Sequence, residues 1–231
     1  MNLDGVFLDM YGTLTTGDRA AVERVCGDIL HDTGVPLSAY QLSVTWGERF
    51  FDALDFANDG NFQTLFEVEA RTLRETMRAL GVAVEPSGYV RQLTEYWRDP
   101  PLQPEAREFL ATFPLPICLV SNADRADLEA ALGRHGIRVG HVVTSEEVRA
   151  YKPAPRIFEV ALARTGWRRE HVIHVGDSLH SDVGGARRAG LRAGWINRAH
   201  RIHDIGKHRP DYEFEDLHGL TTLVCRRQDD P

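Results

Sequence analysis

The chain has little of what marks secreted, membrane-spanning or nucleic-acid-binding proteins. Its 231 residues contain three cysteines, widely spaced and in no CxxC pair, which argues against a disulfide framework or a zinc finger and favours a reduced, cytoplasmic setting. No apolar run approaches the roughly 20 residues that span a bilayer, and the first residues do not resemble a signal peptide. The net charge is −7, with basic residues scattered among acidic ones, so no positive stripe offers itself to nucleic acid or to an anionic membrane. A small-molecule partner is favoured, and the oligomeric state stays open.

Short apolar runs that end in polar residues predict the strands of a parallel sheet. The runs that lead into side chains able to do chemistry are residues 6–8 before Asp9, 117–120 before Ser121, and 172–175 before Asp177. Shorter runs lie at 141–143 and 194–196, with helical patterns between them. Strands that alternate with helices indicate an α/β fold with a Rossmann-like parallel sheet. Because the carboxyl ends of such strands meet in one crevice, we expect the three polar residues to converge there.

Residues 15–95 differ, because their apolar positions recur at the spacing of amphipathic helices. Ser38 and Asn61 are expected to begin two of these helices, and the last follows Pro86. A proline-rich stretch then returns the chain to the strand–helix pattern. The sequence therefore predicts a four-helix cap domain over residues 15–95, inserted into an α/β core made of residues 1–14 and 96–231.

Four motifs follow the predicted strands in a fixed order. The first is a DxxGT turn formed by Asp9, Tyr11, Gly12 and Thr13; the others are Ser121, then Lys152 with Pro153 after it, then Gly176 and Asp177 with Asp182 beyond them. In these motifs, and in the helical insertion directly after the first, the chain resembles the haloacid dehalogenase superfamily of hydrolases. The resemblance implies that Asp9 is a covalent nucleophile.

The phosphatase-like branch of that superfamily supplies the main functional prediction. It implies a magnesium-dependent phosphohydrolase that cleaves a small-molecule phosphate monoester through an aspartyl-phosphate on Asp9. A carboxylate attacks a phosphate dianion only where the anion's charge is neutralised and the attack is held in line. The resemblance implies Mg²⁺ held by Asp9, the Tyr11 backbone carbonyl and Asp177, since oxygen ligands suit this ion. Asp182 completes the acidic set and is better suited to orienting a metal-bound water or Lys152.

The remaining motif residues receive supporting roles from the same resemblance. Lys152 offsets the repulsion between the carboxylates and the substrate, and Ser121, with Asn122 beside it and nearby backbone N–H groups, holds phosphoryl oxygens. Thr13 steadies the Asp9 loop. His180 is a candidate for an acid or base that the first motif lacks.

Tyr11 departs from the phosphatase pattern, where a second Asp protonates the leaving group. A tyrosine, with an ordinary pKa near 10, seldom acts as a base at neutral pH. Tyrosine here resembles the 2-haloacid dehalogenases, whose Asp displaces halide from carbon and forms an ester without a metal; residues 195–198 resemble that branch too. Against this alternative, Asp177, Phe158 and Glu48 stand where the dehalogenases place a neutral residue, a Tyr and a cap Arg. The dehalogenase is therefore the alternative, and a transferase, a phosphonate-cleaving enzyme or a binding domain also stay open.

Overall fold

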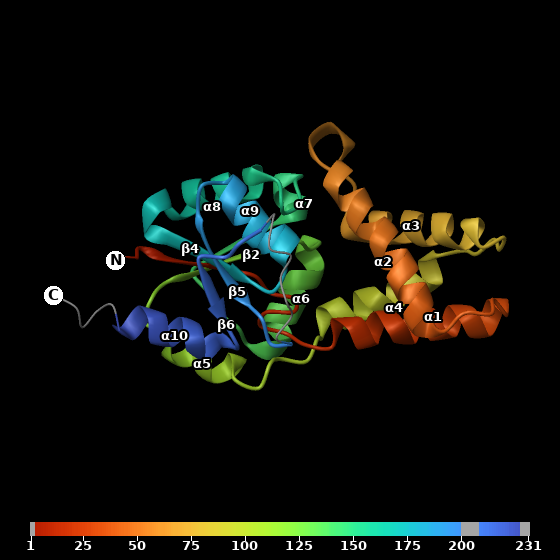
Figure 1. The fold of residues 1–231 in the computed structure, drawn as a ribbon, viewed down its shortest axis with the longest axis horizontal. Coiled ribbons are helices and arrows are strands. Elements are labelled where there is room, and N and C mark those ends of the chain that lie inside the picture. The colour runs from red at the N-terminus through yellow and green to blue at the C-terminus, as the bar shows by residue number, and fades with distance from the viewer. Residues whose placement is uncertain (1–2, 200–207, 227–231) are drawn as a thin grey trace.

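The computed structural model describes residues 3–199 and 208–226, and Figure 1 shows a central sheet with a group of helices beside it. The strands are β1 Gly5–Leu8, β2 Ile117–Ser121, β3 His141–Thr144, β4 Val172–Gly176, β5 Arg192–Ile196 and β6 Tyr212–Phe214. They form one sheet in the order β3-β2-β1-β4-β5-β6, and every neighbouring pair is parallel. The predicted Rossmann-like α/β fold is confirmed; β6 was not predicted.

Helices cover both faces of the sheet, which is why its central strands read as continuous apolar runs. One face carries α5 (Ala106–Thr112), α6 (Arg125–His135) and α10 (Leu217–Arg226), and the other carries α8 (Pro155–Thr165) and α9 (Gly185–Arg188). Because side chains alternate along a strand, Val6 and Leu8 pack on the first face and Phe7 on the second. The short α7 (Ser145–Val148), η2 (Arg169–His171) and the π-helical turn η3 (Leu179–Gly184) complete the core.

The inserted helices lie together to one side of the sheet in Figure 1 and pack on one another. They are α1 Asp18–Thr33, α2 Ala39–Phe56, the single turn η1 Asp59–Asn61, α3 Leu65–Ala79 and α4 Ser87–Arg98. Their shared core includes Val25, Leu42, Leu73 and Leu93, all fully buried or nearly so. The last helix runs to Arg98, past the predicted boundary at residue 95. No helix in the described ranges is long and apolar enough to cross a membrane.

The starts of two cap helices show which capping signals determine where a helix begins. Ser38 begins α2 as predicted, because its hydroxyl accepts from the Gln41 N–H while the Gln41 side chain accepts from the Ser38 N–H. The prediction that Asn61 begins the next helix is wrong, since Asn61 lies in η1. Thr64 and Glu67 form the capping box of α3 instead. A capping box satisfies two first-turn N–H groups at once, so it outweighs a lone asparagine.

The two segments that join the cap to the core run side by side. Thr15 and Leu102 form an antiparallel bridge, and the Thr16 N–H donates to the Pro101 carbonyl at 2.8 Å. The chain therefore leaves the core and returns to it at one place.

Candidate active site

The carboxyl ends of β1, β2 and β4 bring most of the predicted site residues together. Asp9, Asp177 and Asp182 offer carboxylate oxygens that all lie within 4.8 Å of one another. Lys152 comes from the loop before α8 and reaches two of them. The sequence-based expectation that distant strand ends meet at one point thus matches the arrangement of these four side chains.

Lys152 is the centre of the cluster, and its side chain is only 2% exposed. Its Nζ donates to Asp9 Oδ1 at 2.6 Å, to Asp182 Oδ1 at 2.7 Å and to the Val120 carbonyl at 2.9 Å. Burial alone would lower the pKa of Lys152, but the charges of the two carboxylates outweigh it and hold this pKa above its ordinary value. Lys152 is therefore a fixed ammonium that offers all three of its donors to groups of the protein.

Asp9 stands at the end of the fully buried strand β1. Burial and the charge of Asp182 raise the pKa of Asp9 to about 6, although Lys152 opposes the shift. The Thr13 hydroxyl donates to Asp9 Oδ2 at 3.1 Å, which agrees with the predicted steadying role. Gly12 has a φ of 82°, and a Cβ there would meet the Asp177 carboxylate at 2.7 Å, so only glycine allows this turn to form beside Asp177.

Asp182 is buried beneath the pocket and receives several donors. Its Oδ1 lies 2.9 Å from His174 Nε2 and also accepts from Lys152, while Oδ2 accepts from the Ser178 N–H at 3.0 Å. Burial raises its pKa, but Lys152 and His174 outweigh burial and bring the pKa of Asp182 below its ordinary value. A Cβ at Gly176 would meet the Asp182 carboxylate at 2.2 Å. Asp182 is thus positioned to orient Lys152.

The second motif has one residue that fixes Lys152 and one whose hydroxyl is unused. Asn122 forms a reciprocal pair with the backbone of Lys152: its Oδ1 accepts from the Lys152 N–H at 2.7 Å, and its Nδ2 donates to the Lys152 carbonyl at 3.0 Å. Ser121 is fully buried, and its hydroxyl has no hydrogen-bond partner within the described chain. A buried, unsatisfied hydroxyl is unfavourable, so a ligand oxygen that reached Ser121 would relieve that cost.

Tyr11 extends from the nucleophile loop toward the cap. Its hydroxyl donates to the backbone carbonyl of Trp97 at 2.8 Å, and the two rings meet edge to face at 5.3 Å between centroids. Burial raises the pKa of Tyr11 above its ordinary value. The hydroxyl is thus held as a donor to the cap, which removes it as an acid or base for the leaving group.

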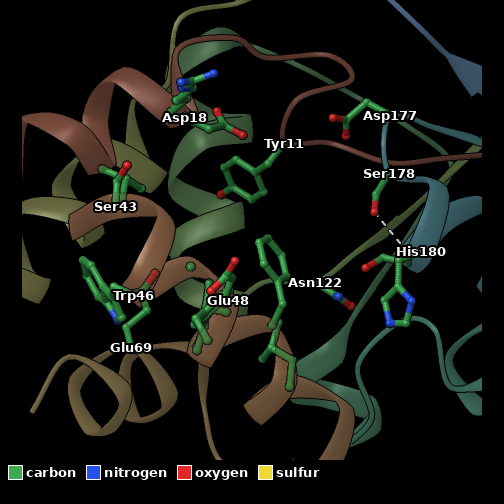
Figure 2. Close-up of a pocket in the computed structure, with 18 of the residues that line it drawn as sticks. Tyr11, Asp18, Ser43, Trp46, Glu48, Glu69, Asn122, Asp177, Ser178 and His180 are labelled. Carbon is green, nitrogen blue, oxygen red and sulfur yellow. Dashed lines mark hydrogen bonds between the residues drawn. The ribbon is translucent and has the colours of Figure 1, made fainter. Parts of the chain in front are cut away.

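A cavity of about 860 Å³ lies between core and cap, and Asp9, Lys152 and Asp177 line its floor. Figure 2 shows Trp46, Glu48 and Glu69 of the cap on one side of this pocket and Asp177, Ser178 and His180 of the core on the other. Other lining residues from the cap are largely aromatic or aliphatic, among them Tyr40, Val44, Phe50, Phe51, Leu54 and Leu93. His180 Nε2 lies 2.9 Å from Asp55 Oδ1 of α2, so this histidine joins core to cap at the rim.

Comparison with known proteins assigns the family. Residues 3–190 match the family described as haloacid dehalogenase-like hydrolase. The chain belongs to this family. It is 25% identical to the (S)-2-haloacid dehalogenase 2 of Pseudomonas sp. strain CBS-3 over 228 residues, which cover 95% of each chain. The solved L-2-haloacid dehalogenase RSc1362 superposes with a TM-score of 0.80 at 24% identity, covering 97% of this chain and 100% of that one.

A phosphatase is also similar, but over less of the chain. The phosphoserine phosphatase of Thermus thermophilus is 37% identical over 158 residues, which cover 64% of this chain and 61% of that protein. Several relatives matched over nearly the whole chain are instead (S)-2-haloacid dehalogenases. The hydrolase prediction is therefore confirmed, whereas the predicted magnesium-dependent phosphohydrolase with a phosphorylated substrate is wrong, and the dehalogenase alternative is better supported.

The predicted Mg²⁺ cofactor is wrong for the same reason, and the side chains suggest why. The prediction gave Asp9, Tyr11, Asp177 and Asp182 to the ion. In the structure, Oδ1 of both Asp9 and Asp182 accepts from Lys152 Nζ, so a buried ammonium balances the charge of these two carboxylates. Lysine carries a compact point charge, which can hold carboxylates together without a metal ion.

Sequence reasoning missed Glu69 and Trp97 as pocket residues. Glu69 lies four residues from both Leu65 and Leu73, so it falls in the apolar stripe of α3. An acidic residue inside such a stripe is a usable signal, because carboxylates are rarely buried without a reason. Trp97 occupies an apolar position of the predicted helix after Pro86, and that pattern carries no further signal.

Proposed function

We propose that this haloacid dehalogenase-like hydrolase cleaves the carbon–halogen bond of a 2-halogenated carboxylic acid, with Asp9 as nucleophile and without a metal. The observation that supports it best is the pair of hydrogen bonds from Lys152 Nζ to Asp9 at 2.6 Å and Asp182 at 2.7 Å. This lysine holds Asp9 in one orientation while leaving its other oxygen, Oδ2, facing the Thr13 hydroxyl. Relatives of nearly the same length act on substrates of this class.

In the first step, an Asp9 carboxylate oxygen attacks the halogen-bearing carbon from the side opposite the halogen. A carbon–oxygen bond forms, the carbon–halogen bond breaks, and halide leaves with the bonding electron pair. No proton is transferred, so the engagement of the Tyr11 hydroxyl by the Trp97 carbonyl does not hinder the reaction. The unsatisfied Ser121 hydroxyl is the candidate donor to the substrate's carboxylate.

In the second step, water attacks the carbonyl carbon of the Asp9 ester, which releases the 2-hydroxy acid and restores the Asp9 carboxylate. The attacking water must lose a proton to a base. Asp177 lines the pocket and offers an oxygen within 4.8 Å of one from Asp9, close enough for a water to lie between them. We therefore assign Asp177 as that base; it returns the proton to the alkoxide oxygen that leaves as the hydroxyl of the product, and Lys152 stabilises the charge that develops on the carbonyl oxygen of the ester.

Halide release from (S)-2-chloropropionate, compared with Asp9→Asn, tests the proposal. Wild type is expected to release chloride at the same rate with EDTA or with added Mg²⁺, and Asp9→Asn to release none. A single turnover in H₂¹⁸O with enzyme in excess should place the label in Asp9 and leave the product hydroxyl unlabelled. Label in the product alone, or chloride release only with Mg²⁺, would overturn the proposal.

A further inference from the structure

Glu69 is a carboxylic acid built into the cap side of the pocket. Glu69 is only 4% exposed, yet it lines the cavity (Figure 2). Its side chain makes one hydrogen bond to another described residue: Oε1 accepts from Trp97 Nε1 at 3.0 Å. The second oxygen has no such partner, and it is not among the fully buried atoms that lack one, so it is accessible from the cavity. An accessible oxygen on an otherwise buried carboxyl group is a position at which a substrate group can form a hydrogen bond.

Trp97 connects Glu69 to the reacting end of the pocket. The indole N–H is held by Glu69, the backbone carbonyl by the Tyr11 hydroxyl, and the ring by edge contact with the Tyr11 ring. Tyr11 lies two residues after Asp9. One continuous wall thus runs from the nucleophile loop to Glu69, so a substrate that reacts at Asp9 and extends along this wall reaches the acid.

The rest of the cap side is apolar or acidic. Besides Glu69 itself, Asp18 and Glu48 line it, against one basic residue, Arg19, whose guanidinium is engaged by Glu23 at 2.7 Å and lies over the Tyr40 ring. A negatively charged group at this end of the substrate would meet net repulsion from Asp18 and Glu48. The aromatic and aliphatic lining favours an apolar group instead, and a cavity of about 860 Å³ lies in the range of sites for drug-sized ligands rather than small acids.

We propose that Glu69 is a specificity-determining residue for the end of the substrate remote from the halogen. That end is a bulky apolar group, of the size of an aromatic ring, carrying an uncharged hydroxyl or amide that hydrogen-bonds to the Glu69 carboxylic acid. The inference rests on the proposed dehalogenation for the position of the reacting end, and it deepens that function by naming the substrate class.

The protonation of Glu69 agrees with an uncharged partner. Burial, helped by the charges of Asp124 and Asp127, raises the pKa of Glu69 to about 8, although the hydrogen bond from Trp97 opposes the shift. The group therefore carries a proton at neutral pH, and a carboxylic acid can both donate and accept a hydrogen bond.

Wild-type rates test the substrate class with 2-chloropropionate, 2-chloro-3-phenylpropionate and the ortho-, meta- and para-hydroxyphenyl analogues of the latter. The buried ring should raise kcat/KM about tenfold over 2-chloropropionate, and the best-placed hydroxyl should add roughly three- to tenfold more. Analogues that carry a carboxylate or an aminomethyl group in place of the hydroxyl should be poorer than the phenyl compound. A preference for 2-chloropropionate, or for either charged analogue, would overturn the proposal.

Variants of Glu69 then test whether this residue causes the gain in kcat/KM that the substrate hydroxyl gives. The ratio of kcat/KM for the best hydroxyphenyl substrate over the phenyl substrate should fall to about one in Glu69→Leu and stay near the wild-type ratio in Glu69→Gln, which keeps a hydrogen-bonding group. Glu75→Leu is the matched control, because Glu75 lies on the same helix, has 44% of its side chain exposed and pairs with Arg71. A ratio unchanged in Glu69→Leu, or lowered equally by Glu75→Leu, would refute the role of Glu69.

Binding of the halogen-free analogues separates this inference from the proposed function. Calorimetry with 3-phenylpropanoate and its hydroxyphenyl analogues should show the same ratio of Kd values, with the same dependence on Glu69, whether or not any chloride is released. Chloride release without a hydroxyl preference in either assay overturns the inference and leaves the dehalogenation standing. The binding preference without chloride release supports the site and overturns the reaction. Should Glu69→Leu fail to fold, the wild-type ratios still decide the substrate class, and loss of the ratio in Glu69→Gln would refute the role of Glu69.

Discussion

The carboxylate of Asp124 accepts a hydrogen bond from the backbone N–H of Leu65 at 2.7 Å, across the boundary between core and cap. Its other oxygen accepts from the Phe66 N–H at 3.1 Å. A residue from the loop after β2 thus caps the first turn of α3, where unpaired N–H groups and the helix dipole favour a negative charge. One contact between core and cap thus also completes the first turn of a cap helix.

Removal of this contact should loosen the cap. Asp124→Ala is expected to lower the free energy of unfolding by about 1 kcal/mol, the usual cost of a lost cap, which is a fall in Tm of roughly 2–4 °C for a chain of this size. Amide exchange at Leu65 and Phe66 should accelerate. Glu129→Ala is the control, because Glu129 is exposed and pairs only with Arg125 on its own helix. Equal effects of both substitutions would contradict the assigned contact.

Replacement of Lys152 should cost both stability and activity. Lys152→Met leaves Asp9 and Asp182 buried with no ammonium between them, and breaking a buried ion pair in this way typically costs about 3–5 kcal/mol. Adding Asp182→Asn removes one of the two uncompensated carboxylates, so the double variant should be more stable than Lys152→Met alone. Urea unfolding of the four members of this cycle measures the coupling. Additive effects of the two substitutions would show that the residues do not share a charge cluster.

The rate of halide release should depend on the ionisation of Asp9. Burial and Asp182 raise the pKa of Asp9 to about 6, and only the ionised carboxylate is a nucleophile. kcat/KM is therefore expected to be full above about pH 7 and to fall by about tenfold per pH unit below 6. Thr13→Val removes a hydrogen bond to the charged form, so the acidic limb should move to higher pH. A rate that is flat from pH 5 to 8 would contradict the assignment.

Asp177→Asn should separate the two steps of the reaction. An amide cannot take the proton from water, so the ester on Asp9 should form and persist. We expect about one chloride per enzyme in a burst, and a covalent adduct in the intact mass of the variant. The double variant Asp9→Asn with Asp177→Asn should form no adduct. Steady turnover by Asp177→Asn at the wild-type rate would assign the base elsewhere.

The buried Glu69 should make the stability of the protein depend on pH. Its pKa is raised above the unfolded value, so its contribution is complete below about pH 4.5 and is lost as pH rises toward about 8, at up to about 1.4 kcal/mol per pH unit. Glu69→Gln cannot ionise. The difference in unfolding free energy between variant and wild type, measured with urea from pH 5.5 to 8, should therefore change with pH. A constant difference would show that Glu69 is ionised throughout.

The sequence predicted the core better than the cap. Five of the strands follow from apolar runs, because burial on both faces leaves no other pattern for a strand such as β1. The sixth, β6, has a partly exposed Tyr212 and an exposed Glu213, so it offered no such run. Asn61 was wrongly predicted to begin a helix, because the spacing of apolar residues does not distinguish a lone asparagine from the capping box that Thr64 forms.

The site residues were found by their positions at strand ends and by the family resemblance, but few of their partners were. The resemblance placed Asp9, Lys152 and Asp182 in one site and implied that Asp182 orients a metal-bound water or Lys152, whereas the hydrogen bonds from Lys152 to Asp9 and to the Val120 carbonyl depend on side-chain orientations that no spacing encodes. The same holds for Tyr11, whose hydroxyl could have been read as an acid until its bond to the Trp97 carbonyl was seen. A pair of residues 86 positions apart in the chain is fixed by tertiary packing, which local sequence does not reveal.

The paired linkers at Thr15 and Leu102 make the cap a replaceable module. Because these two residues already lie opposite each other in an antiparallel bridge, a short turn between them would close the chain without shifting the register of the sheet. Insertions, deletions or whole substitute caps can therefore be accepted at this point while Asp9 and Lys152 keep their places. Such a junction permits relatives to share one chemistry and to differ widely in substrate.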